Sequence, residues 1–242
     1  MPETKTKKIK NSFKLPSVQE LIDAGVHLGH KKSKWNPKME NFILKQKGGL
    51  HIIDVEKTIE GLERALKFIQ ETIENGHEII FVSTKPPFKK LVQETAERLG
   101  QPYVSERWLG GSLTNFKNIF KRVELFRQYQ EKKEKDELGK YTKKERTQME
   151  KEMNRLGKKL SGLTKMRKMP GALFIVGLKE AKVALDEAIT LNLPVIAFCD
   201  TDADPSKISY PIPSSDDSLT AIGLIMDKVA EAVEGIQKKQ SV

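Results

Sequence analysis

Short apolar runs alternate with segments of helical periodicity along most of the chain. Residues 78–83, 172–177 and 194–200 are nearly continuous apolar runs, which are typical of strands buried on both faces of a parallel sheet. Residues 86–100 and 178–192 repeat apolar side chains at helical spacing. This alternation predicts an α/β fold, in which helices cover both faces of a parallel sheet to give three layers.

The N-terminal part of the chain departs from this rhythm. Ser17 and Glu20 have the spacing of a capping box, which predicts a short helix. Residues 26–39 have no clear period, and we expect an exposed loop with the chemistry of a contact surface. Residues 42–53 contain two β-prone runs separated by Lys-Gly-Gly, which predicts a hairpin, and Asp54 is expected to cap the helix that follows.

A long insertion separates the first apolar runs from the later ones. Residues 114–169 predict two helices joined by a short break, with a second capping box at Thr142 and Glu145. One face of the first helix is apolar: Phe116, Phe120, Val123 and Phe126. The second helix repeats apolar residues at heptad spacing: Met149, Met153, Leu156, Leu160 and Leu163. We predict an antiparallel helical hairpin, either as a coiled coil or as a simple helix pair packed on the body.

Three parts follow from these patterns. Residues 1–14 form a basic tail that has too little apolar surface to order itself unless it is bound. Residues 15–113 and 170–242 form one discontinuous α/β body, and residues 114–169 form the hairpin. The sequence RWLGGSLTN, residues 107–115, joins the body to the hairpin.

The joining stretch has the residues that a rigid turn needs. Gly110 and Gly111 allow close backbone turns. Trp108 is expected to pack as an anchor between body and hairpin. Thr114 or Asn115 can cap the outgoing helix. We therefore expect this stretch to aim the hairpin more than to bind a partner itself.

The formal net charge of +10 is concentrated in the insertion. Residues 114–169 carry 18 basic and 8 acidic residues, whereas residues 170–242 carry 6 basic and 11 acidic ones. A basic field on one arm points to a polyanion, most of all to nucleic acid. The alternative is a solvated helix surface. The acidic C-terminal part would repel RNA and is expected to face protein or solvent.

Composition indicates a protein of the reducing cytosol. The chain has a single cysteine, Cys199, which excludes an internal disulfide and a cysteine-based zinc site and fits a small core residue. No segment approaches the roughly 18 apolar residues of a membrane span, and the N-terminal residues lack the apolar core of a secretory signal. We expect a cytoplasmic protein without membrane contact.

The sequence does not contain the motifs of a nucleotide-dependent enzyme. No glycine-rich phosphate loop follows a strand, and prolines after Lys85 remove the amide donors that a phosphate cradle needs. No catalytic Ser, His and Asp set can be named. Asp200, Asp202 and Asp204 resemble the start of a calcium loop, but prolines stand where that loop needs glycine and glutamate. We expect an acidic turn that binds backbone amides, and no enzymatic activity or small-molecule substrate.

His27 and His30 have HxxH spacing, which on a helix can place two imidazoles on one face. No cysteine or carboxylate of matching spacing is near in sequence. The favoured interpretation is that one ring packs or caps locally and the other faces a phosphate. We therefore predict no cofactor, although zinc or magnesium completed by distant acids or by a partner stays open, with His27 and His30 as weak candidate ligands.

Eight motifs in order carry a resemblance to a known family. They are AGVHLGH at 24–30, WNPKM at 35–39, HIID at 51–54, RWLGGSLTN at 107–115, TKKE at 142–145, ALF at 172–174, DTDADP at 200–205 and IPSSDD at 212–217. In these residues the chain closely resembles the bacterial-type ribosomal protein S-two family of the small subunit. The resemblance implies a flavodoxin-like parallel sheet with an inserted antiparallel coiled-coil hairpin, placed between the head and the body of the small ribosomal subunit. It also implies contact with ribosomal RNA, with neighbouring ribosomal proteins and with S-one, the protein that captures messenger RNA.

The charge and the resemblance agree on one mechanism, in which lysine and arginine side chains bind RNA phosphates. That the RNA is ribosomal and the role structural is what the resemblance implies. The predicted RNA-binding residues are Lys31, Lys32, Lys34, Trp35, Lys38, Arg107, Lys117, Lys121, Arg122, Lys143, Lys144, Arg146, Lys165, Arg167 and Lys168. Trp35 could stack on an unpaired base or fill a gap under its loop. The alternative function is a non-ribosomal adaptor of the same fold, which would bind proteins through its acidic face and its coiled coil.

Overall fold

The computed structural model describes residues 13–135 and 142–240, except for the side chains of residues 238–240. Two predicted features lie outside the described residues: the basic tail up to residue 12, and the break between the insertion helices at residues 136–141. No helix of the described part combines the length and the apolar composition that crossing a bilayer requires.

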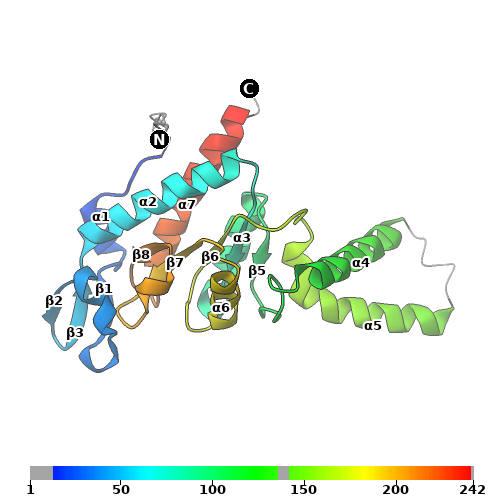
Figure 1. The fold of residues 1–242 in the computed structure, drawn as a ribbon, viewed down its shortest axis with the longest axis horizontal. Coiled ribbons are helices and arrows are strands. Elements are labelled where there is room, and N and C mark those ends of the chain that lie inside the picture. Colours follow the sequence, from blue (N-terminus) through cyan, green and yellow to red (C-terminus); the bar gives the residue numbers. More distant parts are fainter. Residues whose placement is uncertain (1–12, 136–141, 241–242) are drawn as a thin grey trace, which may run out of the picture.

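A five-stranded parallel sheet forms the centre of the molecule (Figure 1). Its order is β5-β4-β6-β7-β8, so the first parallel strand in sequence lies second in the sheet, as in flavodoxin-like folds. The strands are β4 (Ile79–Val82), β5 (Tyr103–Val104), β6 (Ala172–Ile175), β7 (Val195–Cys199) and β8 (Tyr210–Pro213). The prediction of an α/β fold around a parallel sheet is confirmed.

The apolar pattern does not predict β8, because prolines interrupt this strand. Pro211 pairs with Ala197 of β7, and Pro213 pairs with Cys199. Proline has no amide hydrogen to donate, so it is tolerated in a sheet only at an edge, which is where β8 lies.

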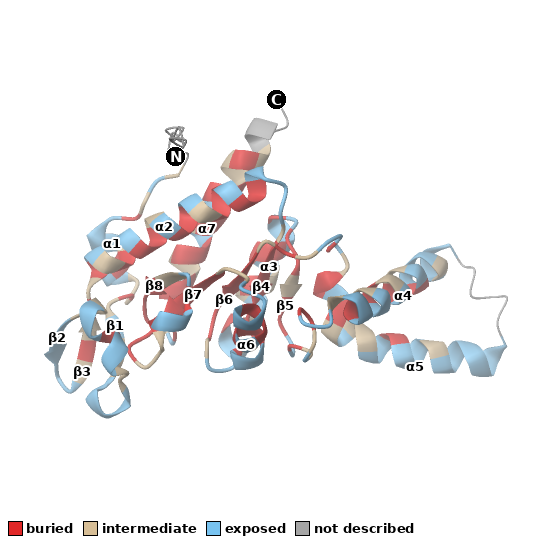
Figure 2. Ribbon diagram, viewed as in Figure 1, coloured by how far each residue is buried: buried red, intermediate tan, exposed pale blue. Residues whose placement is uncertain are grey.

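Helices cover both faces of the parallel sheet, and its central strands are buried (Figure 2). One face packs against α2 (Val55–Glu74), α3 (Lys89–Arg98), which follows the 3₁₀ turn η3 (Pro86–Phe88), and α7 (Leu219–Gln240). The other packs against α6 (Lys182–Thr190) and the base of the insertion helices. Asp54 caps α2 as predicted, and Ser218 accepts a hydrogen bond from the first turn of α7.

A second, antiparallel sheet lies at the N-terminal side, which we call the N-terminal sheet. After the capped helix α1 (Val18–Asp23) come β1 (Leu28–Lys31), the 3₁₀ turns η1 (Lys32–Lys34) and η2 (Pro37–Phe42), and the predicted hairpin of β2 (Ile43–Lys47) and β3 (Leu50–Ile53). The prediction of a loop at residues 26–39 is wrong for β1. Its LGHK sequence has no apolar alternation, and the strand forms because it pairs with the free edge of β3.

The insertion helices α4 (Phe116–Glu134) and α5 (Lys143–Leu160) project from the body, and we call them the arm (Figure 1). Thr142 and Glu145 form the predicted capping box, and α5 ends in the 3₁₀ turn η5 (Ser161–Leu163). The helices meet in a small cluster of Phe126, Tyr129 and Met153. A helix pair is observed, whereas the coiled coil stays a prediction.

Candidate nucleic-acid interface

The joint, residues 107–115, is organised around one buried carboxylate on α6. Oε1 of Glu187 accepts hydrogen bonds from Trp108 Nε1 at 3.1 Å and from the Gly111 amide at 2.8 Å. Its Oε2 accepts from the amides of Leu113 at 2.9 Å and Thr114 at 3.1 Å, and from the Thr114 hydroxyl at 3.2 Å. Glu187 therefore fixes the turn from which α4 departs. The prediction that Trp108 anchors the arm is confirmed, since its side chain is buried.

Sequence reasoning missed Glu187. It lies among apolar neighbours on the buried side of α6, and a carboxylate there needs donors that could come from any part of the chain. Burial alone would raise the pKa of Glu187, but the hydrogen bonds from Leu113, Thr114, Trp108 and Gly111 lower it below its ordinary value. The carboxylate is therefore held in its charged form.

The predicted capping of α4 by the joint is wrong. Asn115 stands at the capping position, but its side chain makes no capping hydrogen bond. The Thr114 hydroxyl donates to Glu187 instead. The Thr114 hydroxyl is therefore bound to Glu187 and does not cap α4.

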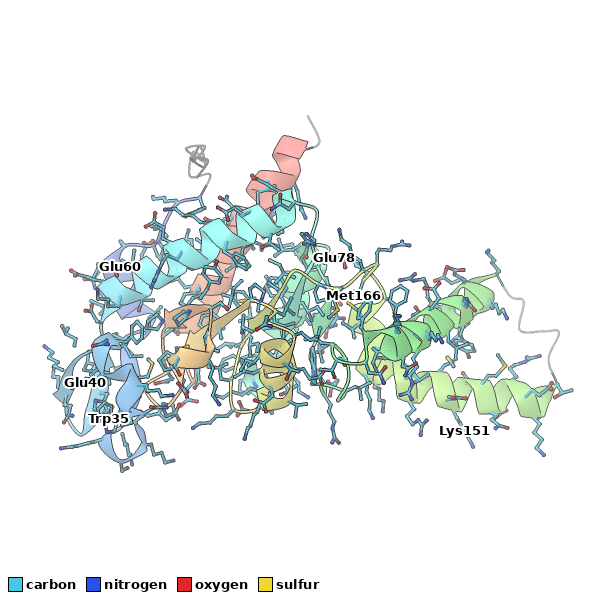
Figure 3. All side chains as sticks on the ribbon, in the orientation of Figure 1. Trp35, Glu40, Glu60, Glu78, Lys151 and Met166 are labelled. Atoms are coloured by element: carbon cyan, nitrogen blue, oxygen red, sulfur yellow. The ribbon has the colours of Figure 1, made fainter. Side chains whose placement is uncertain are left out.

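The insertion cations predicted to bind RNA lie in two places on the arm. They are all exposed: Lys117, Lys121, Arg122, Lys143, Lys144, Arg146, Lys165, Arg167 and Lys168. None forms an ion pair with another residue of the described ranges. One group follows the joint and the base of the arm, and the other lies at the far end of α5. Lys151, midway along α5, also projects from the arm (Figure 3). Arg107 is exposed on the joint itself.

The remaining predicted residues lie at the opposite end of the molecule, on the N-terminal sheet (Figure 1). Lys31, Lys32 and Lys34 are exposed there. Lys31 and Lys47 pair with Leu50 from the two neighbouring strands, so Lys47 and its strand mate Lys45 extend this basic surface. Sequence reasoning missed these two lysines, although their alternation along β2 places them on one face. The structure therefore does not bring all predicted residues together.

Two predicted residues of this end have partners within the protein. Lys38 Nζ donates to Asp204 Oδ2 at 2.8 Å and to Ser206 Oγ at 2.9 Å. Trp35 stacks on the buried ring of His51, with 5.1 Å between ring centroids. Of its two predicted roles, Trp35 has the packing contact in the free protein.

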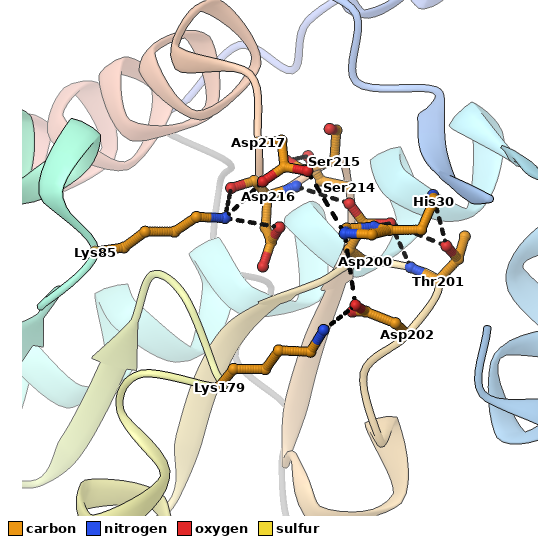
Figure 4. A network of polar contacts seen from close by, with 10 residues as sticks. All are labelled: His30, Lys85, Lys179, Asp200, Thr201, Asp202, Ser214, Ser215, Asp216 and Asp217. Carbon is orange, nitrogen blue, oxygen red and sulfur yellow. Dashed lines mark hydrogen bonds and ion pairs between the residues drawn. The ribbon is translucent and has the colours of Figure 1, made fainter. Parts of the chain in front are cut away.

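A network of acids and cations lies at the carboxyl ends of β4, β6 and β7 (Figure 4). His30 Nδ1 lies 3.1 Å from Asp200, and its Nε2 lies 3.5 Å from both Asp202 and Asp217. Lys85 Nζ lies 2.8 Å from Asp217 and 3.1 Å from Asp216, and Lys179 pairs with Asp202. Carboxylates surround His30, so this ring has its polar partners within the protein.

The network sets the protonation of its members. Burial opposes the charged form of His30, but the hydrogen bond and the charge of Asp200, with Asp202 and Asp217, raise the pKa of His30 above its usual value. Burial, together with the charges of Asp200 and Asp217, raises the pKa of Asp216 against the effect of Lys85. Asp200 also accepts hydrogen bonds from the amides of Thr201 and Asp216, which confirms the predicted acidic turn.

The same network is where a metal ion could bind. His30, Asp216 and Asp217 each offer one ligand atom, and these atoms lie within 4.8 Å of one another. His30 lies on β1 and not on a helix, so its spacing from His27 does not place the two rings on one helical face. A cation there would compete with Lys85 for the same carboxylates.

An apolar groove of about 440 Å³ lies between α1 and the N-terminal sheet. Val18 and Ile22 of α1 and Leu44 of β2 line it, and Leu44 is 61% exposed. Lys45 and Lys47 stand at its edge. Exposed apolar side chains that gather in one groove are typical of a surface that binds protein.

Comparisons with known proteins agree with the motifs of the chain. A family model described as ribosomal protein S2 matches residues 21–235. The small ribosomal subunit protein uS2 of Micrococcus luteus is 40% identical over 226 residues, which cover 93% of this chain and 79% of that protein. The protein of the same name from Chloroflexus aurantiacus is 39% identical over 225 residues, 93% of this chain and 94% of that protein. The one from Salinispora tropica is 42% identical over 224 residues, 90% of this chain and 74% of that protein.

Proposed function

The chain belongs to the ribosomal protein S2 family, and from this premise we propose that it binds ribosomal RNA of the small subunit, chiefly through phosphate contacts made by the arm. The role is structural and not enzymatic, and the relatives that share the family are named as small-subunit proteins. The observation that supports RNA binding most directly is the set of exposed arm cations that form no ion pair within residues 13–135 and 142–240.

The arm suits RNA phosphates for electrostatic reasons. Each lysine or arginine that contacts a phosphate releases condensed counterions, so affinity falls steeply with salt. Cations already paired with acids would first have to give up those partners. We propose that the protein acts in the cytoplasm, at the junction of the head and body of the small subunit.

The test is the salt dependence of binding to a folded transcript of small-subunit ribosomal RNA. Changing Lys143, Lys144 and Arg146 together to Gln should reduce the slope of log affinity against log salt by up to about 0.9 for each phosphate that the variant no longer neutralises. The control changes three body lysines that pair with acids, Lys57, Lys67 and Lys90, to Gln. Equal slopes for the two triple variants would refute the proposal.

We further propose that the protein helps to dock S-one and that the apolar groove contributes to that interaction. Val18, Ile22 and Leu44 supply an apolar floor, which a surface that binds only phosphates does not need. Leu44→Ser, which removes apolar surface and adds no charge, should weaken binding of purified S-one while RNA affinity stays unchanged. A Leu44→Ser variant that binds S-one normally would remove the groove from this proposal.

The groove also supports the alternative function, a non-ribosomal adaptor of the same fold. Sedimentation of cell extract at low salt separates the alternatives, because a ribosomal protein travels with the small subunit and an adaptor does not. Neither function needs a cofactor. Binding of zinc or magnesium between His30, Asp216 and Asp217 is a separate proposal. Equilibrium dialysis tests it by comparing the metal bound by the wild-type protein with the metal bound by the His30→Ala variant.

A further inference from the structure

A polar pocket lies beside the joint, where α4 leaves the body. Its volume is about 360 Å³. The joint contributes Gly110, Gly111 and Asn115 to its lining, and the first two turns of α4 contribute Asn118, Ile119, Lys121 and Arg122. The pocket therefore combines backbone, amide groups and two cations at a single place.

Packing within the protein does not explain the glycine at position 110. Gly110 is exposed, its φ lies outside the left-handed region, and a Cβ built on it would meet no atom within 4 Å. Gly111 differs, because its φ of 85° favours glycine. A side chain at position 110 could be accommodated by the protein alone, but it would be added to the lining of the pocket.

The two asparagines are also unused by the fold. Asn115 stands at the capping position of α4 without forming the capping bond. Neither the Asn115 nor the Asn118 side chain has a hydrogen-bond partner among residues 13–135 and 142–240. Glu187 meanwhile binds the amides of Gly111, Leu113 and Thr114, so the wall of the pocket is rigid before any ligand arrives.

We infer that this pocket binds one ribose-phosphate unit of RNA, with the phosphate at Lys121 and Arg122 and the 2′-hydroxyl at Asn115 and Asn118. The inference rests on the proposed RNA-binding function and adds a subsite to it. An amide side chain both donates and accepts, as a 2′-hydroxyl does, and the 2′-hydroxyl is what distinguishes RNA from DNA. The far end of the arm offers charge alone, whereas the pocket selects the sugar.

The test compares RNA and DNA binding by the full-length protein. The probes are a uridine 12-mer and the deoxyuridine 12-mer of the same length, measured by fluorescence anisotropy at low salt. Asn115→Ala combined with Asn118→Ala should weaken RNA binding about tenfold, because hydrogen bonds to the sugar are removed, and should change DNA binding less than about twofold. Gly110→Leu should reduce RNA binding similarly, because it fills the pocket.

The matched control removes two exposed amides of the arm outside the pocket, Gln128→Ala with Asn154→Ala, and should leave both affinities unchanged. Thermal unfolding checks that each variant is folded. Equal RNA affinities for the pocket and control variants would overturn the subsite while the proposed function stands. Equal losses for RNA and DNA would also overturn it, since charge and not the sugar would then be recognised. Wild-type protein that binds neither the 12-mer nor small-subunit ribosomal RNA would overturn both proposals.

Discussion

Lysines of the arm and lysines at the carboxyl end of the sheet have the same side chain but differ in pairing with acids. On the arm, Lys143 and Lys144 are exposed and have no acidic partner in the described part of the chain. At the sheet, Lys85 and Lys179 are bound by aspartates of the loops after β7 and β8. Net charge alone cannot separate these groups. The two groups differ in pairing, and for this reason we propose the cations without an acidic partner in the described residues, and not the paired ones, as the ligands of a polyanion.

The largest effect is expected at the anion that holds the arm in place. Glu187→Gln keeps one acceptor oxygen but turns an NH₂ group toward the amides of Leu113 and Thr114 or toward Gly111 and Trp108. Because buried donors then lose their acceptor, the free energy of unfolding should fall by about 3 kcal/mol. Urea unfolding at pH 7 measures it. The control is Asp186→Asn, an exposed neighbour on α6, which should change stability by less than about 0.5 kcal/mol.

The pH dependence of this variant has a definite sign. The folded protein lowers the pKa of Glu187, so its stabilising contribution is complete above the unfolded value of about 4.3 and is lost as pH falls through the folded value. The difference in stability between wild type and Glu187→Gln should therefore shrink below pH of about 4. A difference that stays constant down to acid pH would show that the charge of Glu187 is not what stabilises the joint.

Glu187 also shows where prediction from sequence ends. Local patterns predict the strands β4, β6 and β7, the capping boxes at Ser17 and Thr142 and the hairpin glycines, because each depends on residues close in the chain. The partners of Glu187 come from residues 108–114, and no local pattern connects them to α6. The acids around His30 likewise gather from distant loops. Residue type is therefore enough to predict the exposed cations. The hydrogen-bond and ion-pair partners of buried polar groups are visible only in the structure.

The second effect concerns a cation of the sheet. Lys85→Met should leave Asp216 and Asp217 close together without their shared partner and so lower the free energy of unfolding by about 2 kcal/mol. Lys89→Met, which removes a lysine paired with the exposed Glu106, is the control and should cost less than about 1 kcal/mol. Equal losses in the free energy of unfolding for the two variants would mean that the ion pairs of Lys85 stabilise the fold no more than the exposed ion pair of Lys89.

A smaller effect is expected for Lys38, which was predicted to bind RNA but pairs with Asp204. Hydrogen bonds from Lys38 and Ser206 lower the pKa of Asp204 to about 2. Lys38→Ala should cost less than about 1 kcal/mol at pH 7, since both partners are partly exposed. This cost should disappear as pH falls from about 4 toward 2, because the paired carboxylate then becomes protonated. The companion variant Lys34→Ala should leave stability unchanged, and a cost equal to that of Lys38→Ala would contradict the distinction between them.

The smallest effect on stability is expected for the triple variant of the arm, for which the proposed function predicts a large effect on RNA binding. Changing Lys143, Lys144 and Arg146 together to Gln removes three neighbouring positive charges that have no acidic partner among residues 13–135 and 142–240. Their mutual repulsion is relieved and no ion pair between described residues is broken, so the free energy of unfolding should change by less than about 0.5 kcal/mol. Urea unfolding of this variant, beside the control with Lys57, Lys67 and Lys90 changed to Gln, measures it. A marked loss of stability would show that the arm cations serve the fold, and the weaker RNA binding of the variant could then no longer be assigned to its missing phosphate ligands.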